Sequence, residues 1–138
     1  MMDVIAIGEL LVDLTQTHVA EDGIRHFAAN PGGAPANVAV AAALLGAKTG
    51  FIGKVGDDAY GRDLRDVLER NGVDARGLSM TDECMTTTAV VSVSEDGERS
   101  FDFFRSPGAD SLLTEGEALG ALEETPRVLH FGSISLTS

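Results

Sequence analysis

Short apolar runs rich in β-branched residues recur along the chain and carry its first structural signal. Residues 3–8 (DVIAIG), 49–55 (TGFIGKV) and 127–132 (RVLHFG) have the pattern typical of buried parallel strands. Residues 11–17 alternate in part and predict a second strand or an extended arm. Residues 18–34 carry polar, Gly and Pro residues, which predict a loop or a short edge strand.

Two segments between these strands have helical signals. Residues 36–45 (ANVAVAAALL) are almost wholly apolar, and Pro35 suits a first helical turn as Gly46 suits a C-terminal cap. Because this helix is apolar all round, we expect it to be buried on most sides. Residues 59–70 predict an amphipathic helix. The residues that mark its cap, inner stripe and end are Asp57 or Asp58, Leu64, Val67, Leu68 and Asn71-Gly72.

Two further runs predict a hairpin. Residues 88–94 and 99–105 are strand-like, and the segment between them contains Asp96-Gly97, a strong hairpin signal. After the hairpin, Thr114 and Glu117 have the spacing of a capping box and predict a short helix.

The whole pattern predicts an α/β protein. Apolar strands that alternate with helices indicate a parallel sheet with helical crossovers, and the strand pairs of alternating character indicate an attached antiparallel flap. The 138 residues make one domain at most. Such a sheet normally continues with another crossover helix after its last strand, so we expect residues 1–138 to be the N-terminal part of a longer domain.

Composition narrows the possible partners. Ten Lys and Arg residues against 22 Asp and Glu residues leave a net charge of -12, which argues against nucleic acid and against an anionic membrane surface as partners. The chain has no apolar run of about 20 residues and no pattern of a secretory signal. Cys84 is its only cysteine, so no internal disulfide can form, and we expect a reducing cytoplasm.

Several common motifs are absent. Residues 46–49 (GAKT) carry one residue too many for a phosphate-binding P-loop, and no Gly-x-Gly-x-x-Gly follows the first strand, which argues against a dinucleotide-binding dehydrogenase. His18, His26 and His130 are far apart in the sequence and lack ligand spacing with one another or with Cys84, so no metal site is expected.

Residues 30–37 (NPGGAPAN) are the most informative stretch. Gly32 and Gly33 precede a helix, where bare backbone N–H groups can bind an oxygen-rich ligand. Asn37 is the one polar residue in the first turns and can bind a pair of sugar hydroxyls. A tight turn, with Asn37 capping a neighbouring backbone, is an equally good interpretation of the same residues.

Asp13 is a second candidate because it lies among apolar residues of a predicted strand. A carboxylate there needs partners, and it can accept two hydroxyl hydrogens from a polyol. The alternative is that Asp13 lies on a solvated strand face.

The hairpin supplies a third candidate group. Period-2 alternation places Phe101, Phe103 and Arg105 on one face, opposite Asp102 and Phe104. Two aromatic rings beside a guanidinium could form a wall over a polar ligand. In the other interpretation, which the pattern alone favours, the phenylalanines cover the core and Arg105 lies in solvent.

Taken together, these motifs resemble the N-terminal signature of the PfkB/ribokinase-type carbohydrate kinases. The resemblance covers nearly the whole chain and rests on four elements in the same order: residues 8–13 (GELLVD), 32–39 (GGAPANVA) with Gly46, 53–61 (GKVGDDAYG) and 97–105 (GERSFDFFR).

The resemblance implies a three-layer ribokinase-like α/β body with a small β-sheet lid, formed by strands near residues 12–30 and 88–105. It implies phosphoryl transfer from ATP, with Mg²⁺, to a sugar hydroxyl, and a homodimer that associates through the lids. The substrate-binding residues implied by position are Asp13, Gly32, Gly33, Asn37, Phe103 and Arg105.

The resemblance also implies what the chain lacks. The family's Gly-Ala-Gly-Asp-type loop, which holds the general base, is absent, so we expect no catalytic residue here and a nucleotide site largely outside the chain. We therefore expect residues 1–138 to be inactive alone.

The form of the motifs favours one sugar. Ala34-Pro35 after the glycine pair and the Phe-x-Phe-Phe-Arg hairpin resemble fructokinases, so fructose is favoured. A 2-keto-3-deoxygluconate kinase stays open, because Arg105 could bind the carboxylate of a sugar acid. A further alternative is a non-catalytic sugar-binding fragment.

Overall fold

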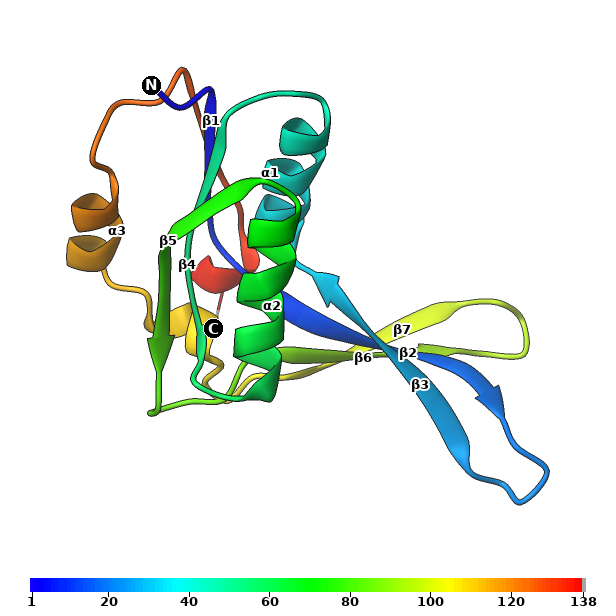
Figure 1. The fold of residues 1–138 in the computed structure, drawn as a ribbon. Helices are drawn as coiled ribbons and strands as arrows, with labels where there is room; N and C mark the ends of the chain where they lie inside the picture. Colours follow the sequence, from blue (N-terminus) through cyan, green and yellow to red (C-terminus); the bar gives the residue numbers. More distant parts are fainter. Residues whose placement is uncertain (138) are drawn as a thin grey trace.

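The computed structural model describes residues 1–137 and divides their strands between two four-stranded sheets (Figure 1). The first sheet is parallel throughout and forms the body of the molecule. Its strands, in spatial order, are β5 (Val73–Thr81), β4 (Thr49–Gly56), β1 (Val4–Ile7) and β8 (Val128–Phe131).

The second sheet extends from the body as a lid (Figure 1). Its strands, in spatial order, are β3 (Arg25–Gly32), β2 (Leu11–Val19), β6 (Thr88–Val93) and β7 (Arg99–Phe104). Both hairpins are antiparallel, but β2 and β6 pair in parallel. The expectation of an antiparallel flap is therefore wrong for the central pair, because β2 and β6 both leave the body in the same direction.

Helices cover the parallel sheet unequally. α1 (Ala34–Leu44) and α2 (Ala59–Arg70) lie on one face, and the short α3 (Glu115–Ala121) lies on the other side (Figure 1). Of two short 3-10 helices, η1 (Ala109–Leu112) lies between β7 and α3 in the sequence, and η2 (Ile134–Leu136) follows β8. The core between the sheet and the two long helices contains Ala6, Ala39, Phe51, Leu68 and Leu78.

The expectation that the Ala-rich helix is buried on most sides is wrong for the described chain. Ala36 and Ala39 of α1 are buried against the sheet, whereas Val38 is 37% exposed, Leu44 71% and Leu45 89%. The helix contacts β1 and β4 with one face, and no element of residues 1–137 covers its outer face.

The strand β5 was not predicted from the sequence. Its buried residues are Val73, Ala75 and Leu78, so the alternation breaks after Ala75. The pairing with β4 shifts register between Gly50 and Ile52, which accounts for the break. A period-2 pattern that is interrupted in this way gives little sequence signal.

The Gly-Asp-Asp-x-x-Gly part of the signature has a structural role at the start of α2, where it fixes the helix N-terminus against Thr86. The Asp58 carboxylate accepts hydrogen bonds from the Gly61 N–H at 2.8 Å and from the Thr86 N–H and hydroxyl at 2.8 and 2.7 Å. Burial raises the pKa of Asp58, but these hydrogen bonds outweigh it and leave that pKa below its ordinary value. A Cβ on Gly61 would lie 1.9 Å from the Gly56 carbonyl oxygen, so the close approach of α2 to β4 requires glycine.

Candidate functional site

A row of side chains crosses the lid on one face. The strand register places Asp13 of β2 opposite Asn30 of β3 and opposite Ala89 of β6, and Ala89 opposite Phe103 of β7. Residues directly opposite one another on neighbouring strands share a face of the sheet. Asp13, Asn30 and Phe103 therefore face the same space.

Asp13 is half-buried, and nothing in residues 1–137 donates a hydrogen bond to its carboxylate. Burial raises the pKa of Asp13 above its ordinary value of 3.8, because the charged form loses contact with water. A strand carboxylate that is left without donors is an acceptor available to a ligand.

Gly32 lies directly beneath this carboxylate. A Cβ on Gly32 would lie 2.2 Å from the Asp13 Oδ2 atom, so only glycine leaves the acid its position. Gly32 and Asp13, two of the substrate-binding residues implied by the resemblance, thus lie in contact.

Gly33 turns the chain from β3 into α1. It is the N-cap residue with φ of 108°, and a Cβ there would lie 2.3 Å from the Glu9 carbonyl oxygen. No side chain caps the helix, and Pro35 in its first turn has no N–H. The remaining first-turn amides have no intrahelical acceptor and are free to meet a ligand oxygen.

Asn37 lies one helical turn after Gly33, and its N–H donates to the Gly33 carbonyl at 2.9 Å. Its side chain is exposed and makes no hydrogen bond within residues 1–137. The interpretation of Asn37 as a cap of a neighbouring backbone therefore has no support in the described structure. Residues four apart share a helix face, so Asn37 lies beside the bare N-terminus.

The hairpin places its aromatic rings as the alternation predicts. The Phe101 and Phe103 rings stack with centroids 6.5 Å apart. Phe103 is 47% exposed, so it does not serve to cover the core. Arg105 is not in solvent either, because its guanidinium donates to Asp110, to the Ile134 carbonyl and to the Thr137 hydroxyl.

Sequence reasoning missed two residues of this region. Asn30 belongs to the same row as Asp13, but its position depends on the pairing of β2 with β3, in a segment predicted as a loop or short edge strand. Asp110 was missed because only the fold brings η1 against the end of β7.

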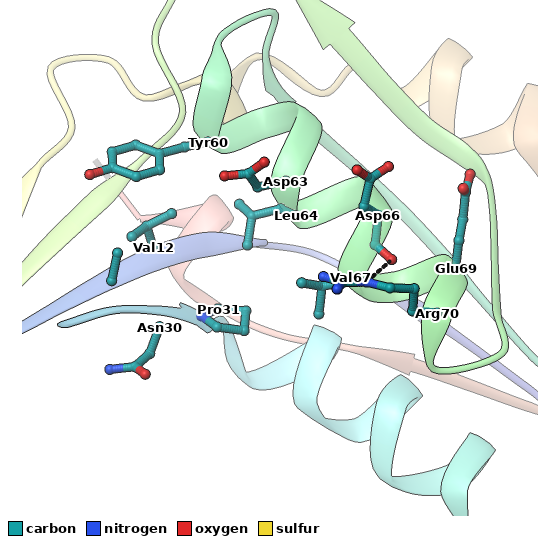
Figure 2. A pocket seen from close by; sticks show the side chains of 11 residues that line it. Val12, Asn30, Pro31, Tyr60, Asp63, Leu64, Asp66, Val67, Glu69 and Arg70 are labelled. Carbon is teal, nitrogen blue, oxygen red and sulfur yellow. Dashed lines mark hydrogen bonds between the residues drawn. The ribbon is translucent and has the colours of Figure 1, made fainter.

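A cleft lies on the other face of the lid, where Val12 points into it (Figure 2). Its volume is about 590 Å³, and it runs between β2–β3 and α2. Val12 points into it, whereas its neighbour Asp13 belongs to the opposite face of β2. The α2 side of the cleft carries the carboxylates of Asp63, Asp66 and Glu69, which would repel a phosphorylated ligand.

Residues 1–137 offer no cluster of side chains suited to a metal ion. His18 and His26, which the sequence separates, stack across β2 and β3 with ring centroids 4.3 Å apart. No cluster of three or more His, Cys, Asp or Glu residues suited to a metal is present among residues 1–137. In the same part of the chain, no helix has the length and apolar character to cross a bilayer.

The parallel body, the small β-sheet lid and the polar face between them define the class of ribokinase-like carbohydrate kinases. The chain belongs to this class as a member of the pfkB family of carbohydrate kinases, whose sequence profile matches residues 1–138.

Relatives of known sequence include several fructokinases. The chain is 45% identical to fructokinase-2 of Zea mays over 139 residues, which cover 98% of this chain and 41% of the maize protein. It is 46% identical to a probable fructokinase-7 of Arabidopsis thaliana, over 96% of this chain and 39% of that protein. The chain thus spans about two fifths of the length of the curated relatives it matches.

Solved structures agree with this assignment. The fructokinase of Xylella fastidiosa superposes with a TM-score of 0.92 at 36% identity, over 100% of this chain and 43% of that one. A fructokinase of Vibrio cholerae O395, solved with fructose, ADP and calcium bound, gives a TM-score of 0.74 at 39% identity, over 85% and 36% of the two chains.

Proposed function

We propose that this chain is the sugar-binding part of a fructokinase-like enzyme, which transfers the γ-phosphoryl group of ATP to a hydroxyl of fructose. The observation that carries the proposal is the Asp13 carboxylate, which is half-buried, lacks a donor in residues 1–137 and lies against Gly32. Its partners would be sugar hydroxyls, since a hydroxyl pair satisfies both carboxylate oxygens without adding charge.

The other groups complete a polyol site around this acid. The first-turn amides after Gly33 would donate to a sugar oxygen, and Asn37 would both donate and accept. Phe103 would form an apolar wall from the lid. Arg105 keeps two of its five N–H groups free of acceptors in residues 1–137, and these could donate to a neutral hydroxyl.

The lid position has a chemical purpose in such an enzyme. A lid that closes over the sugar excludes water, which would otherwise accept the phosphoryl group in place of the sugar. The residues of this chain would hold and orient the acceptor hydroxyl. Their contribution to the rate of phosphoryl transfer would come from this positioning.

ATP and Mg²⁺ belong to the proposal through the relatives. A fructokinase of Xylella fastidiosa was solved with bound ATP. The described residues do not fit a nucleotide-bound metal: Asp58 is occupied by three protein donors, and Asp57 pairs with Arg62. We expect no fructose-dependent ATP turnover by residues 1–138 alone in a coupled assay.

Calorimetric titration with fructose tests the site directly. Asp13→Asn removes charge-assisted hydrogen bonds and should weaken fructose binding roughly 100-fold. The matched control is Asp102→Asn, because Asp102 is exposed on the opposite face of β7 from Phe103. Equal affinities of the two variants for fructose would contradict the proposal.

The assembly and location are further proposals from the family. The lid carries exposed apolar residues, including Phe101, Phe103 and Phe104, which are 55%, 47% and 66% exposed. Such a surface suits a homodimer formed through the lids. A cytoplasmic location suits a chain with one free cysteine.

A further inference from the structure

A buried ion pair lies at the base of the lid, where the chain leaves β7. The Arg105 Nε atom donates to the Asp110 Oδ1 atom at 3.2 Å. The Arg105 side chain is 10% exposed and that of Asp110 is 0% exposed. Bulk water therefore solvates neither charge to any extent, and each charge depends on protein partners.

The remaining nitrogens of the guanidinium are also engaged. They donate to the Ile134 carbonyl at 2.6 Å and to the Thr137 hydroxyl at 3.2 Å. Arg105 thus ties the end of the lid hairpin to the η2 segment that follows β8. A substrate carboxylate would find only two of the five N–H groups of this guanidinium without an acceptor in residues 1–137, and it would meet a cation already paired with Asp110.

Asp110 lies at the centre of the network. Besides Arg105, it accepts hydrogen bonds from the Thr87 hydroxyl and, at 3.0 Å, from the Ser135 hydroxyl. Gly108 allows this packing, because a Cβ there would lie 2.0 Å from the Thr87 Oγ1 atom and 2.9 Å from the Asp110 Oδ1 atom. The chain is shaped to hold a charged acid at this point.

The pair borders the proposed sugar site. Phe103 and Ala89 belong to the row that contains Asp13, and Arg105 follows Phe103 by two residues as Thr87 precedes Ala89 by two. Arg105 and Thr87 stand one residue beyond the ends of β7 and β6, and both donate to Asp110. The guanidinium and its counter-ion therefore lie at the end of the two lid strands that carry Phe103 and Ala89.

We infer that Asp110 is a specificity-determining residue that makes the site select an uncharged sugar over a sugar acid. This inference rests on the proposed function and names the charge class of its substrate. Asp110 neutralises the Arg105 cation at the end of the strands that carry Phe103 and Ala89, and its own negative charge repels an approaching carboxylate. Displacing Asp110 from Arg105 would also leave a buried acid without its counter-ion, which is strongly unfavourable.

The test compares fructose with 2-keto-3-deoxygluconate as ligands of the intact gene product, by calorimetric titration and by turnover where the protein shows it. The wild type should prefer fructose. Asp110→Asn frees the charge of Arg105 and should raise the affinity ratio of the acid to fructose by about tenfold or more. An unchanged ratio in a folded Asp110→Asn variant would overturn the inference while leaving the proposed function intact.

Two further variants separate charge from structure. Ser135→Ala removes one hydrogen bond from Asp110 but keeps its charge, so the ratio should stay within about twofold of the wild type. If Asp110→Asn does not fold, the double variant R105Q/D110N replaces the ion pair by a neutral pair and should leave the ratio within about threefold. A tenfold fall in that ratio would show that Arg105 binds the carboxylate of the sugar acid even when it is paired with Asp110. That result would refute the inference.

A wild type that binds the acid and not fructose would contradict the proposed function, and the inference would fall with it. A wild type that binds neither sugar would have the same consequence. A third outcome is that the wild type binds fructose and Asp110→Asn shows no increase in affinity for the acid. That outcome contradicts the inference about Asp110 and leaves the proposed function standing.

Discussion

At the residue scale, the proposed site places an unfavourable charge where a ligand can use it. Asp13 is half-buried and lacks donors in residues 1–137, so its ionised form is less stable in the folded chain than in water. Asp58 is also partly buried, but its three hydrogen bonds reverse the effect and lower its pKa. The contrast separates an acid that serves the fold from one that is available to a substrate.

Asp13→Asn should therefore stabilise the fold while it weakens sugar binding. Because the pKa of Asp13 is raised by burial, its ionisation costs stability once the pH exceeds 3.8 and rises through the folded-state pKa. Urea unfolding should show the variant to be the more stable protein at pH 7, with the difference lost below pH 3.8. A variant that is less stable than the wild type at pH 7 would show that Asp13 has a structural partner.

At the element scale, a short helix is anchored to the sheet by a single cation. Thr114 and Glu117 form the capping box of α3, as the sequence predicts. The Glu117 carboxylate also meets the Lys54 Nζ atom of β4 at 2.6 Å, and Lys54 donates to the Leu112 carbonyl at 3.1 Å. The hydrogen bond from Lys54, followed by that from Thr114, lowers the pKa of Glu117 from 4.5 to about 2.

This shift defines a pH window for stability. A lowered carboxyl pKa contributes stability above pH 4.5, and the contribution is lost as the pH falls toward about 2. Glu117→Gln should cost about 1 kcal/mol of unfolding free energy at pH 7, a value kept small because the side chain is 39% exposed. Chemical denaturation at a series of pH values should show the difference from wild type shrinking between pH 4.5 and 2. Glu115→Gln is the control, because Glu115 lies in the same turn and makes no ion pair in residues 1–137.

At the scale of the whole molecule, the proposed site draws on both the body and the lid. The body would supply the N-terminus of α1 and the lid would supply Asp13 and Phe103, so a ligand at the proposed site would contact both parts. Apolar side chains stay exposed on both parts, including Phe131 of β8 at 70% and Phe101 of β7 at 55%. Surfaces of this kind are typical of contacts with further polypeptide.

The homodimer proposed for the lid gives a prediction at this scale. Phe101→Ser should shift the intact protein from dimer to monomer in sedimentation velocity, because a buried aromatic anchor contributes much of an interface's stability. Leu45→Ser is the control, since Leu45 is 89% exposed at the end of α1 and away from the lid. A Phe101→Ser protein that sediments as the wild type does would contradict association through this face.

The sequence by itself determined most elements and, through the family resemblance, the candidate residues of the site. β1, β4, β8, α2 and the β6–β7 hairpin were predicted with nearly the observed bounds, because continuous apolar runs, caps and Asp-Gly turns are local signals. Gly32 and Asp13 could be paired through the family resemblance, and the structure brings them together.

Only the tertiary structure decided how these pieces meet. The bulge that breaks the pattern of β5, the parallel pairing of β2 with β6, and the open outer face of α1 all depend on contacts between distant segments. The same holds for Arg105 and Asp110: a buried charge finds its counter-ion by proximity in space, and sequence spacing carries no information about that proximity.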